Sequence, residues 1–376
     1  MIRLAPIFAF IFIAVQSHSS GIQQEFQELT QQAEAARKSD QTKQSIDFYR
    51  RAVAQQPTWS QGWWWLGYLY YQQDRFPEAE AALAQFVALE PRSGPAWALL
   101  GLSEYETHDT KQAQEHLDKW ERDGSSDREY LLDVVDFHRA LLMTARGEFE
   151  QASNLLQDSA RRKGESPVLI EAFGLASLHI PRLPEQYASE YREPVWLAGK
   201  AAFYTALCND ARAQEYLSRL LKAYGTRPDV HYFAGLIFKA QSRNSEALLE
   251  FREELRLSGN HLSAALEAVQ LDLDAKNIAE ATSFAKHATQ IEPENVGARL
   301  AYGDALIADG RFREGVVQLK AAERLDPAKA DVHRKLAEAY RHLGMRTDAD
   351  REAAVRSNTE QKYVPALRPC GAGGTR

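Results

Sequence analysis

The sequence predicts an all-α protein built from stacked antiparallel helix pairs, and three observations support this fold class. Similar side chains recur at intervals of 34 residues, the length of two short helices with their turns. Within one interval, apolar residues such as Leu248, Phe251 and Leu255 lie three and four positions apart, which places them on one face of a helix. The 376 residues include only 21 Gly and 14 Pro, too few for the many tight turns of an all-β protein.

The repeat is clearest near the start of the chain. One unit reads Trp63-x2-Leu66-Gly67-x2-Tyr70, then Ala79-x3-Leu83, then Pro91; residues 34 positions further on repeat it as Trp97, Leu100, Gly101, Ala113 and Leu117. In order and spacing this pattern resembles the tetratricopeptide repeat (TPR). The resemblance covers about residues 26–360 and implies a right-handed superhelical solenoid of about ten units.

The aligned units have small and apolar residues at corresponding positions. They begin at Phe26, Ser60, Gly94, Asp133, Pro167, Pro194, Pro228, Leu262, Val296 and Ala330. Small residues at the eighth and twentieth positions allow the two helices of a unit to approach closely where they cross. Because one helix pair cannot bury its own apolar face, we expect neighbouring units to stack into a continuous core.

The amino terminus predicts export. Residues 1–19 contain a basic start at Arg3, an apolar run from Leu4 to Val15 and small polar residues after it, which is typical of a secretory signal peptide. The run is shorter than the roughly twenty residues that a helix needs to cross a membrane. We expect a periplasmic or secreted protein with no integral membrane span after signal cleavage.

Residues 181–193 interrupt the repeat. Pro181 and Pro184 forbid a normal second helix at this place. One interpretation is a shortened unit with a loop instead of a helix; the other is a loop that lines a binding groove and carries Tyr187 and Tyr191. We expect this loop to separate two semi-independent blocks. The predicted organisation is therefore a signal peptide at 1–19, a block at 20–180, the loop at 181–193, a second block at 194–360 and a flexible tail at 361–376.

No motif indicates a catalytic, cofactor or metal site. The sequence lacks a phosphate-binding Gly-x4-Gly-Lys-Ser/Thr loop, a His-Glu-x2-His zinc helix and a calcium loop. The histidines are scattered, which favours surface or groove positions over metal ligands. Cys208 and Cys370 are too few for a disulfide framework or a structural zinc site. We expect them not to pair, because four stacked units of about 10 Å each separate them.

The charge and the repeat positions together indicate the kind of partner. With 45 basic and 52 acidic residues the formal net charge is −7, which argues against a nucleic-acid partner. The resemblance implies that the fifth, ninth and twelfth positions of each unit line a concave groove for a protein or peptide. The candidate groove residues are Trp64, Tyr68, Tyr71, Leu102, Tyr105, Phe137, Tyr232, Lys239, Asp304, Arg334 and Arg341.

The leading hypothesis for function is a non-catalytic, exported TPR scaffold that binds a peptide or protein partner in this groove. The carboxylate-binding Lys and Asn of TPR proteins that grip cytosolic chaperone tails are replaced by Trp64 and Tyr68, which argues against that use. The first alternative is a structural module of the cell envelope that assembles with itself. A more distant alternative is an envelope enzyme acting on glycans, which would need two carboxylates about 5–10 Å apart.

Overall fold

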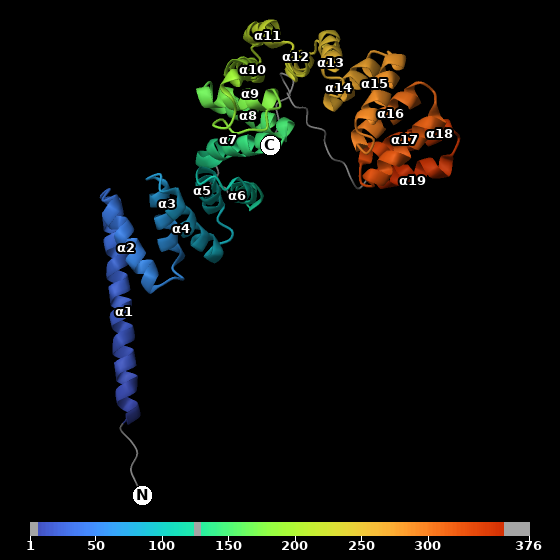
Figure 1. The fold of residues 1–376 in the computed structure, drawn as a ribbon. Coiled ribbons are helices and arrows are strands. Elements are labelled where there is room, and N and C mark those ends of the chain that lie inside the picture. Colours follow the sequence, from blue (N-terminus) through green and yellow to red (C-terminus); the bar gives the residue numbers. More distant parts are fainter. Residues whose placement is uncertain (1–6, 124–128, 357–376) are drawn as a thin grey trace. The chain divides into compact units, whose positions relative to one another are not determined.

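The computed structural model describes residues 7–123 and 129–356, and within these ranges it contains nineteen α-helices, one 3-10 helix and no strand. The all-α prediction is confirmed (Figure 1). The chain divides into two compact units, one ending at Leu142 and the other beginning at Met143. None of the helices in the described residues is long and apolar enough to cross a membrane.

The first unit is a stack of antiparallel helix pairs. Its helices are α1 (Ile7–Lys38), α2 (Thr42–Gln55), α3 (Ser60–Tyr71), α4 (Phe76–Leu89), α5 (Gly94–Glu106), α6 (Thr110–Asp123) and the first part of α7 (Glu129–Ala145). The two helices of a pair cross where the sequence has a small residue. A Cβ added to Gly67 would lie 2.5 Å from Leu83 Cγ on the second helix of the pair. The apolar side chains around these crossings form one continuous core.

The second unit continues the same arrangement. Its helices are α8 (Phe149–Lys163), α9 (Pro167–Ser177), the 3-10 helix η1 (Ser189–Tyr191), α10 (Arg192–Ala206), α11 (Asp210–Tyr224), α12 (Val230–Ala240), α13 (Asn244–Ser258), α14 (Leu262–Asp274), α15 (Ile278–Ile291), α16 (Val296–Ala308), α17 (Phe312–Leu325), α18 (Ala330–His342) and α19 (Arg346–Arg356). Gly303 repeats the close crossing, since its added Cβ would lie 2.6 Å from Leu319 Cγ. Six of the ten predicted unit starts coincide with the first residue of a helix.

The turn within each pair needs a residue in the left-handed region. Gly310, between α16 and α17, has φ +75°, a conformation that glycine adopts without steric cost. The N–H of the next residue, Arg311, donates to Leu306 O at 2.8 Å and closes the end of α16. The Gly-containing turns of the sequence therefore lie where the repeat predicts them.

Residues 181–193 lie inside the second compact unit, and the boundary between the two units falls between Leu142 and Met143. Helix α10 packs antiparallel on α9 and takes the place of the missing second helix. The contact is between backbones: a Cβ added to Gly174 would lie 1.9 Å from Val195 O, and one added to Gly199 would lie 1.9 Å from Ile170 O. The two prolines shorten α9 but leave this crossing intact.

Two further expectations concern the ends of the chain and its cysteines. The predicted tail at 361–376 and residues 1–6 of the predicted signal peptide lie outside the described residues. Cys208 is disulfide-bonded, so the expectation that it stays unpaired is wrong. The sequence contains one other cysteine, Cys370, which also lies outside the described residues.

Candidate functional site

The first unit presents a group of half-buried aromatic side chains, which we call the aromatic surface. It consists of Trp64, Tyr68, Tyr71, Phe86, Tyr105 and Phe137. Trp64 and Tyr68 are one helical turn apart on α3, and their rings stack with centroids 6.2 Å apart. Phe86 reaches Trp64 from α4, with a centroid distance of 5.5 Å. Each of these six side chains is neither fully buried nor fully exposed, so part of its apolar area faces solvent.

Helices α5 and α7 extend the aromatic surface. Tyr105 and Phe137 each make an edge-on contact with the ring of His138, at centroid distances of 4.7 Å and 5.3 Å. Burial lowers the pKa of His138 below its ordinary value, which keeps the ring neutral. In that state the Nδ1–H donates to Val134 O at 2.7 Å and fixes the ring orientation. The histidine therefore acts as an uncharged spacer between the two aromatic rings.

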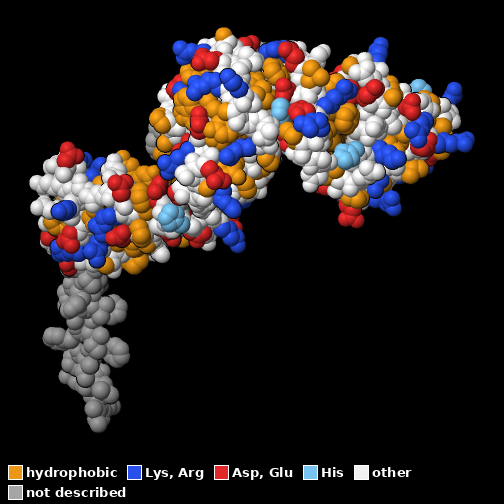
Figure 2. Space-filling view, turned by 45° about the horizontal axis from the view of Figure 1, so that its top comes forward, with side chains coloured by type: hydrophobic (Ala, Val, Ile, Leu, Met, Phe, Trp, Pro, Cys, Tyr) orange, Lys and Arg blue, Asp and Glu red, His pale blue; other side chains and the backbone are white. Residues whose placement is uncertain are grey.

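The space-filling view is consistent with an apolar surface on this unit. Hydrophobic side chains reach the surface of the amino-terminal unit in several patches between charged groups (Figure 2). The first helices of successive pairs touch each other, as α3 touches α5, so their side chains share one face. Aromatic residues on such a face offer large contact area at a small cost in side-chain entropy.

Two of the predicted groove residues are not available to a partner. Leu102 is only 1% exposed and belongs to the continuous core of the first unit. Tyr232 is 2% exposed because the rings of His179, His261 and Phe251 pack around it. Neighbouring side chains therefore cover both of these positions.

Two charged candidates of the second unit form ion pairs with residues on the first helix of the following repeat. Lys239 on α12 forms an ion pair with Glu267 on α14, and Asp304 on α16 forms one with Lys335 on α18. These pairs join the first helices of consecutive repeats. Their charges are satisfied inside the stack, which makes them weaker candidates for partner recognition than the aromatic surface.

The other exposed candidates lie on α18. Arg334 is exposed and pairs with Asp331 at 3.1 Å, whereas Arg341 is exposed near the end of the helix. Exposed ion pairs of this kind contribute little to stability. Both arginines belong to the second compact unit, whereas the aromatic surface belongs to the first.

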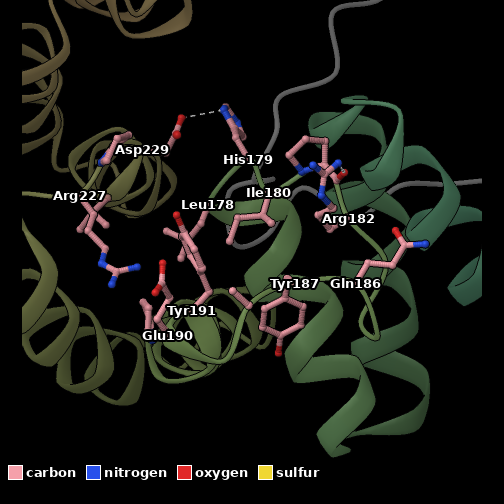
Figure 3. A pocket seen from close by; sticks show the side chains of 15 residues that line it. Leu178, His179, Ile180, Arg182, Gln186, Tyr187, Glu190, Tyr191, Arg227 and Asp229 are labelled. Atoms are coloured by element: carbon pink, nitrogen blue, oxygen red, sulfur yellow. Dashed lines mark hydrogen bonds and ion pairs between the residues drawn. The ribbon is translucent and has the colours of Figure 1, made fainter.

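Residues from the segments 178–194 and 227–230 line an open cavity of about 690 Å³ in the second unit (Figure 3). Tyr187 and Tyr191 both line it. The Tyr187 hydroxyl donates to Glu171, and burial together with this carboxylate raises the pKa of Tyr187 to about 12. The Arg227 guanidinium lies 4.9 Å from the centre of the Tyr191 ring. The segment is thus packed and ordered by specific contacts.

One wall of the cavity contains a cluster that the sequence did not reveal. His179 and Asp229 line the cavity, and His261 contacts the same carboxylate from outside its lining. Burial alone would raise the pKa of Asp229, but the hydrogen bonds from the two imidazoles prevail and lower it to about 2. The carboxylate is therefore ionised in this cluster.

A second cluster joins α17, α18 and α19. Glu323, His333 and Glu352 place their ligand-type atoms within 4.8 Å of one another. The Lys320 ammonium lies 2.8 Å from both Glu323 and Glu352 and supplies the positive charge. His333 completes the network by a 2.7 Å contact from Nδ1 to Glu352 and a 2.8 Å contact from Nε2 to Pro327 O. This is a structural ion network with its cation already present.

Sequence comparison identifies the repeat in both compact units. Two models of the tetratricopeptide repeat family match the chain, one at residues 30–93 and 66–128 and the other at residues 272–338. Both stretches contain TPRs. The aromatic residues Trp64, Tyr68 and Tyr105 lie within the first stretch, and the ion pair between Asp304 and Lys335 lies within the second.

Known proteins resemble parts of the chain. A TPR repeat-containing thioredoxin, TTL4 of Arabidopsis thaliana, is 38% identical over 79 residues, which is 21% of this chain and 12% of that protein. The structure of MamA 41-end from Desulfovibrio magneticus RS-1 is similar over 43% of this chain and 98% of its own, with 21% identity and a TM-score of 0.38. YrrB, described as a TPR protein with an unusual peptide-binding site, is similar over 45% of this chain and 89% of its own, with 17% identity and a TM-score of 0.40.

Proposed function

We propose that this protein is a non-catalytic TPR scaffold that binds a peptide or protein partner through the aromatic surface of its first unit. The observation that supports this most strongly is the set of half-buried rings on α3, α5 and α7. Trp64 and Tyr105 are held by neighbouring rings in fixed orientations, so little side-chain entropy is lost when a partner binds. Aromatic anchors of this kind contribute much of the binding energy at protein interfaces.

Binding should be tested by recovery of partners from a cell-envelope extract. Two baits are compared: the wild-type chain and a triple variant that combines Trp64→Ala, Tyr68→Ala and Tyr105→Ala. Trp196→Ala is the matched control, because Trp196 is 42% exposed on α10 in the other unit. We expect a partner that is recovered with wild type and the control but is lost with the triple variant. Circular dichroism must show equal helix content in all three chains. Equal recovery with the triple variant would refute the aromatic surface as the binding site.

We also propose that the protein is exported and works in the periplasm or outside the cell. The pattern of residues 1–19 supports this, since it combines a basic start with a short apolar run. The disulfide at Cys208 gives independent support, because disulfides persist in oxidising compartments and are rare in the cytosol. Amino-terminal sequencing of the protein isolated from the envelope fraction should show a new terminus near residue 20. A chain that retains Met1 and stays with the cytosolic fraction would refute export.

A further inference from the structure

Three side chains from two repeats, each next to the end of a different helix, converge in the second unit. His179 follows α9, Asp229 directly precedes α12, and His261 directly precedes α14. Asp229 Oδ1 lies 3.0 Å from His179 Nδ1 and 3.0 Å from His261 Nε2. One nitrogen of each ring and one carboxylate oxygen all lie within 4.8 Å of one another. The side chains are partly buried, with 17%, 21% and 12% of their surface exposed for His179, Asp229 and His261.

The backbone around Asp229 frees its carboxylate for this cluster. Asp229 has φ +66°, whereas the residues before α14 and α16, His261 and Asn295, have φ near −84° in the extended region (−83° and −85°). Asp229 makes no side-chain cap on its own helix. Instead, the buried Glu254 accepts from the N–H groups of Asp229 and Tyr232, both at 3.2 Å. A second carboxylate thus caps α12, and the carboxylate of Asp229 points to the imidazoles.

We propose that His179, Asp229 and His261 bind one zinc ion. Two imidazole nitrogens and a carboxylate oxygen are the donors of a three-ligand zinc site, which keeps its fourth position for water or another ligand. With zinc about 2.0–2.2 Å from each donor, neighbouring donors of a tetrahedral site lie about 3.3–3.6 Å apart. The two 3.0 Å distances therefore need to lengthen by only a few tenths of an ångström.

The proton positions show what zinc binding must change. His261 Nδ1 accepts from the N–H of Ala264 at 3.1 Å, so its Nε2 carries the proton that points to Asp229. On zinc binding the Nε2 lone pair goes to the metal and the ring proton moves to Nδ1. The Ala264 N–H then loses His261 Nδ1 as its acceptor. In His179 the metal takes Nδ1 and the proton moves to Nε2. Each ring stays neutral, and the metal replaces both bridging protons.

The surroundings distinguish this cluster from the network at Glu323, His333 and Glu352. There, Lys320 occupies the position of the cation, with 2.8 Å contacts to two carboxylates. Around Asp229 the neighbours are instead rings: Phe149 stacks on His179 at 4.3 Å, and Tyr232 lies 4.5 Å from His261. The apolar rings exclude water from one side, and the cavity lined by His179 and Asp229 gives an ion access from the other.

Zinc binding should be measured on the untagged, non-reduced full chain after treatment with a chelator. Calorimetric titration with Zn²⁺ is expected to show one ion per chain. His261→Asn is the informative variant, because asparagine is a good N-cap and can keep the bond to Ala264 while the imidazole is lost. We expect its zinc affinity to fall at least tenfold, because replacing even a residue that only supports a zinc ligand typically costs ten- to a hundredfold in affinity. His333→Gln should leave the affinity unchanged, since it belongs to the network that holds Lys320.

Cobalt substitution identifies the donors independently of affinity. Bound Co²⁺ should give the visible absorption of a four-coordinate site without the near-ultraviolet charge-transfer band of a thiolate, because both ring ligands and the carboxylate lack sulfur. A thiolate band would place the metal on a cysteine and overturn the proposal. So would the absence of zinc binding at micromolar concentration, or equal affinity in wild type and His261→Asn when both have the same melting temperature without metal.

Discussion

The crossing of α9 and α10 allows a quantitative prediction. Gly174→Ala places a methyl group 1.9 Å from Val195 O and 2.6 Å from Val195 C. Ordinary van der Waals contact begins at 3.4 Å, so the helices must separate by about 1.5 Å at this point (3.4 − 1.9). A side chain could rotate away, but the two nearest atoms belong to the backbone of α10. The substitution therefore strains the whole pair.

The magnitude follows from two opposing effects. Overpacking in a core costs about 1–3 kcal/mol, and the upper end applies because the backbone is rigid. Alanine favours the helical conformation more than glycine does, which stabilises the folded chain by about 1 kcal/mol. We expect the free energy of unfolding to fall by about 2 kcal/mol. Gly199→Ala meets Ile170 O at the same distance and should cost the same. Because both substitutions separate the same pair of helices, the double variant should lose less free energy of unfolding than the two single variants lose together.

Urea unfolding followed by far-UV circular dichroism measures these changes, and hydrogen exchange of peptides from α9 and α10 localises them. Gly297→Ala on α16 is the matched control, since its added Cβ has only Asn295 Oδ1 at 3.1 Å and Leu266 Cδ1 at 3.5 Å nearby. We expect the control to be as stable as wild type or up to about 1 kcal/mol more stable, since it gains helix propensity without a backbone clash. A Gly174→Ala chain as stable as wild type, with unchanged protection of α9, would show that the helices do not pack as described.

Three further predictions concern the second unit. Burial alone would lower the pKa of His333, but its hydrogen bonds to Glu352 and to the Pro327 carbonyl raise it. The protonated imidazole therefore stabilises the folded state. This stabilisation is complete below the unfolded-state pKa of about 6.5 and is lost as the pH rises through the folded-state pKa. The difference in melting temperature between wild type and His333→Gln should therefore shrink as the pH rises above about 6.5, and a constant difference would contradict the network. Limited proteolysis should not cut first within 181–193, because the segment is packed; early cuts there that release two stable fragments would favour a hinge instead. Tyr187→Phe removes the hydroxyl that donates to Glu171, so spectrophotometric titration should lose the tyrosine of highest pKa, about 12 in wild type; an unchanged titration would exclude that bond.

The sequence predicted the repeat because the period is imposed by local packing. Gly67 and Gly303 are small since a second-helix leucine occupies the space beside them, and this need returns with every unit. The start of α14 at Leu262 and of α16 at Val296 follow from the same register. These features depend on contacts within one unit or between neighbours, which a 34-residue pattern records.

Contacts that join distant or irregular units were not predictable in this way. His179 and Asp229 are 50 positions apart (229 − 179), and His261 follows 32 positions later. No local metal-binding spacing relates them, so each histidine looks like an isolated polar residue. Tyr232 was expected to reach solvent because its repeat position does so in a regular array, but these histidines cover it. The left-handed backbone at Asp229 has no sequence signal of its own.

The binding role of the aromatic surface is tested most directly by site-specific photocrosslinking in the living cell. A photoreactive phenylalanine analogue should replace Trp64 in one strain, Tyr105 in a second and Trp196 in a third as the control. Adducts with the same partner at positions 64 and 105, and none at 196, are the predicted result. Adducts of twice the mass of the chain would identify a second copy as the occupant and favour self-assembly. No adduct at 64 or 105, with adducts at 196, would contradict the aromatic surface as the site of binding.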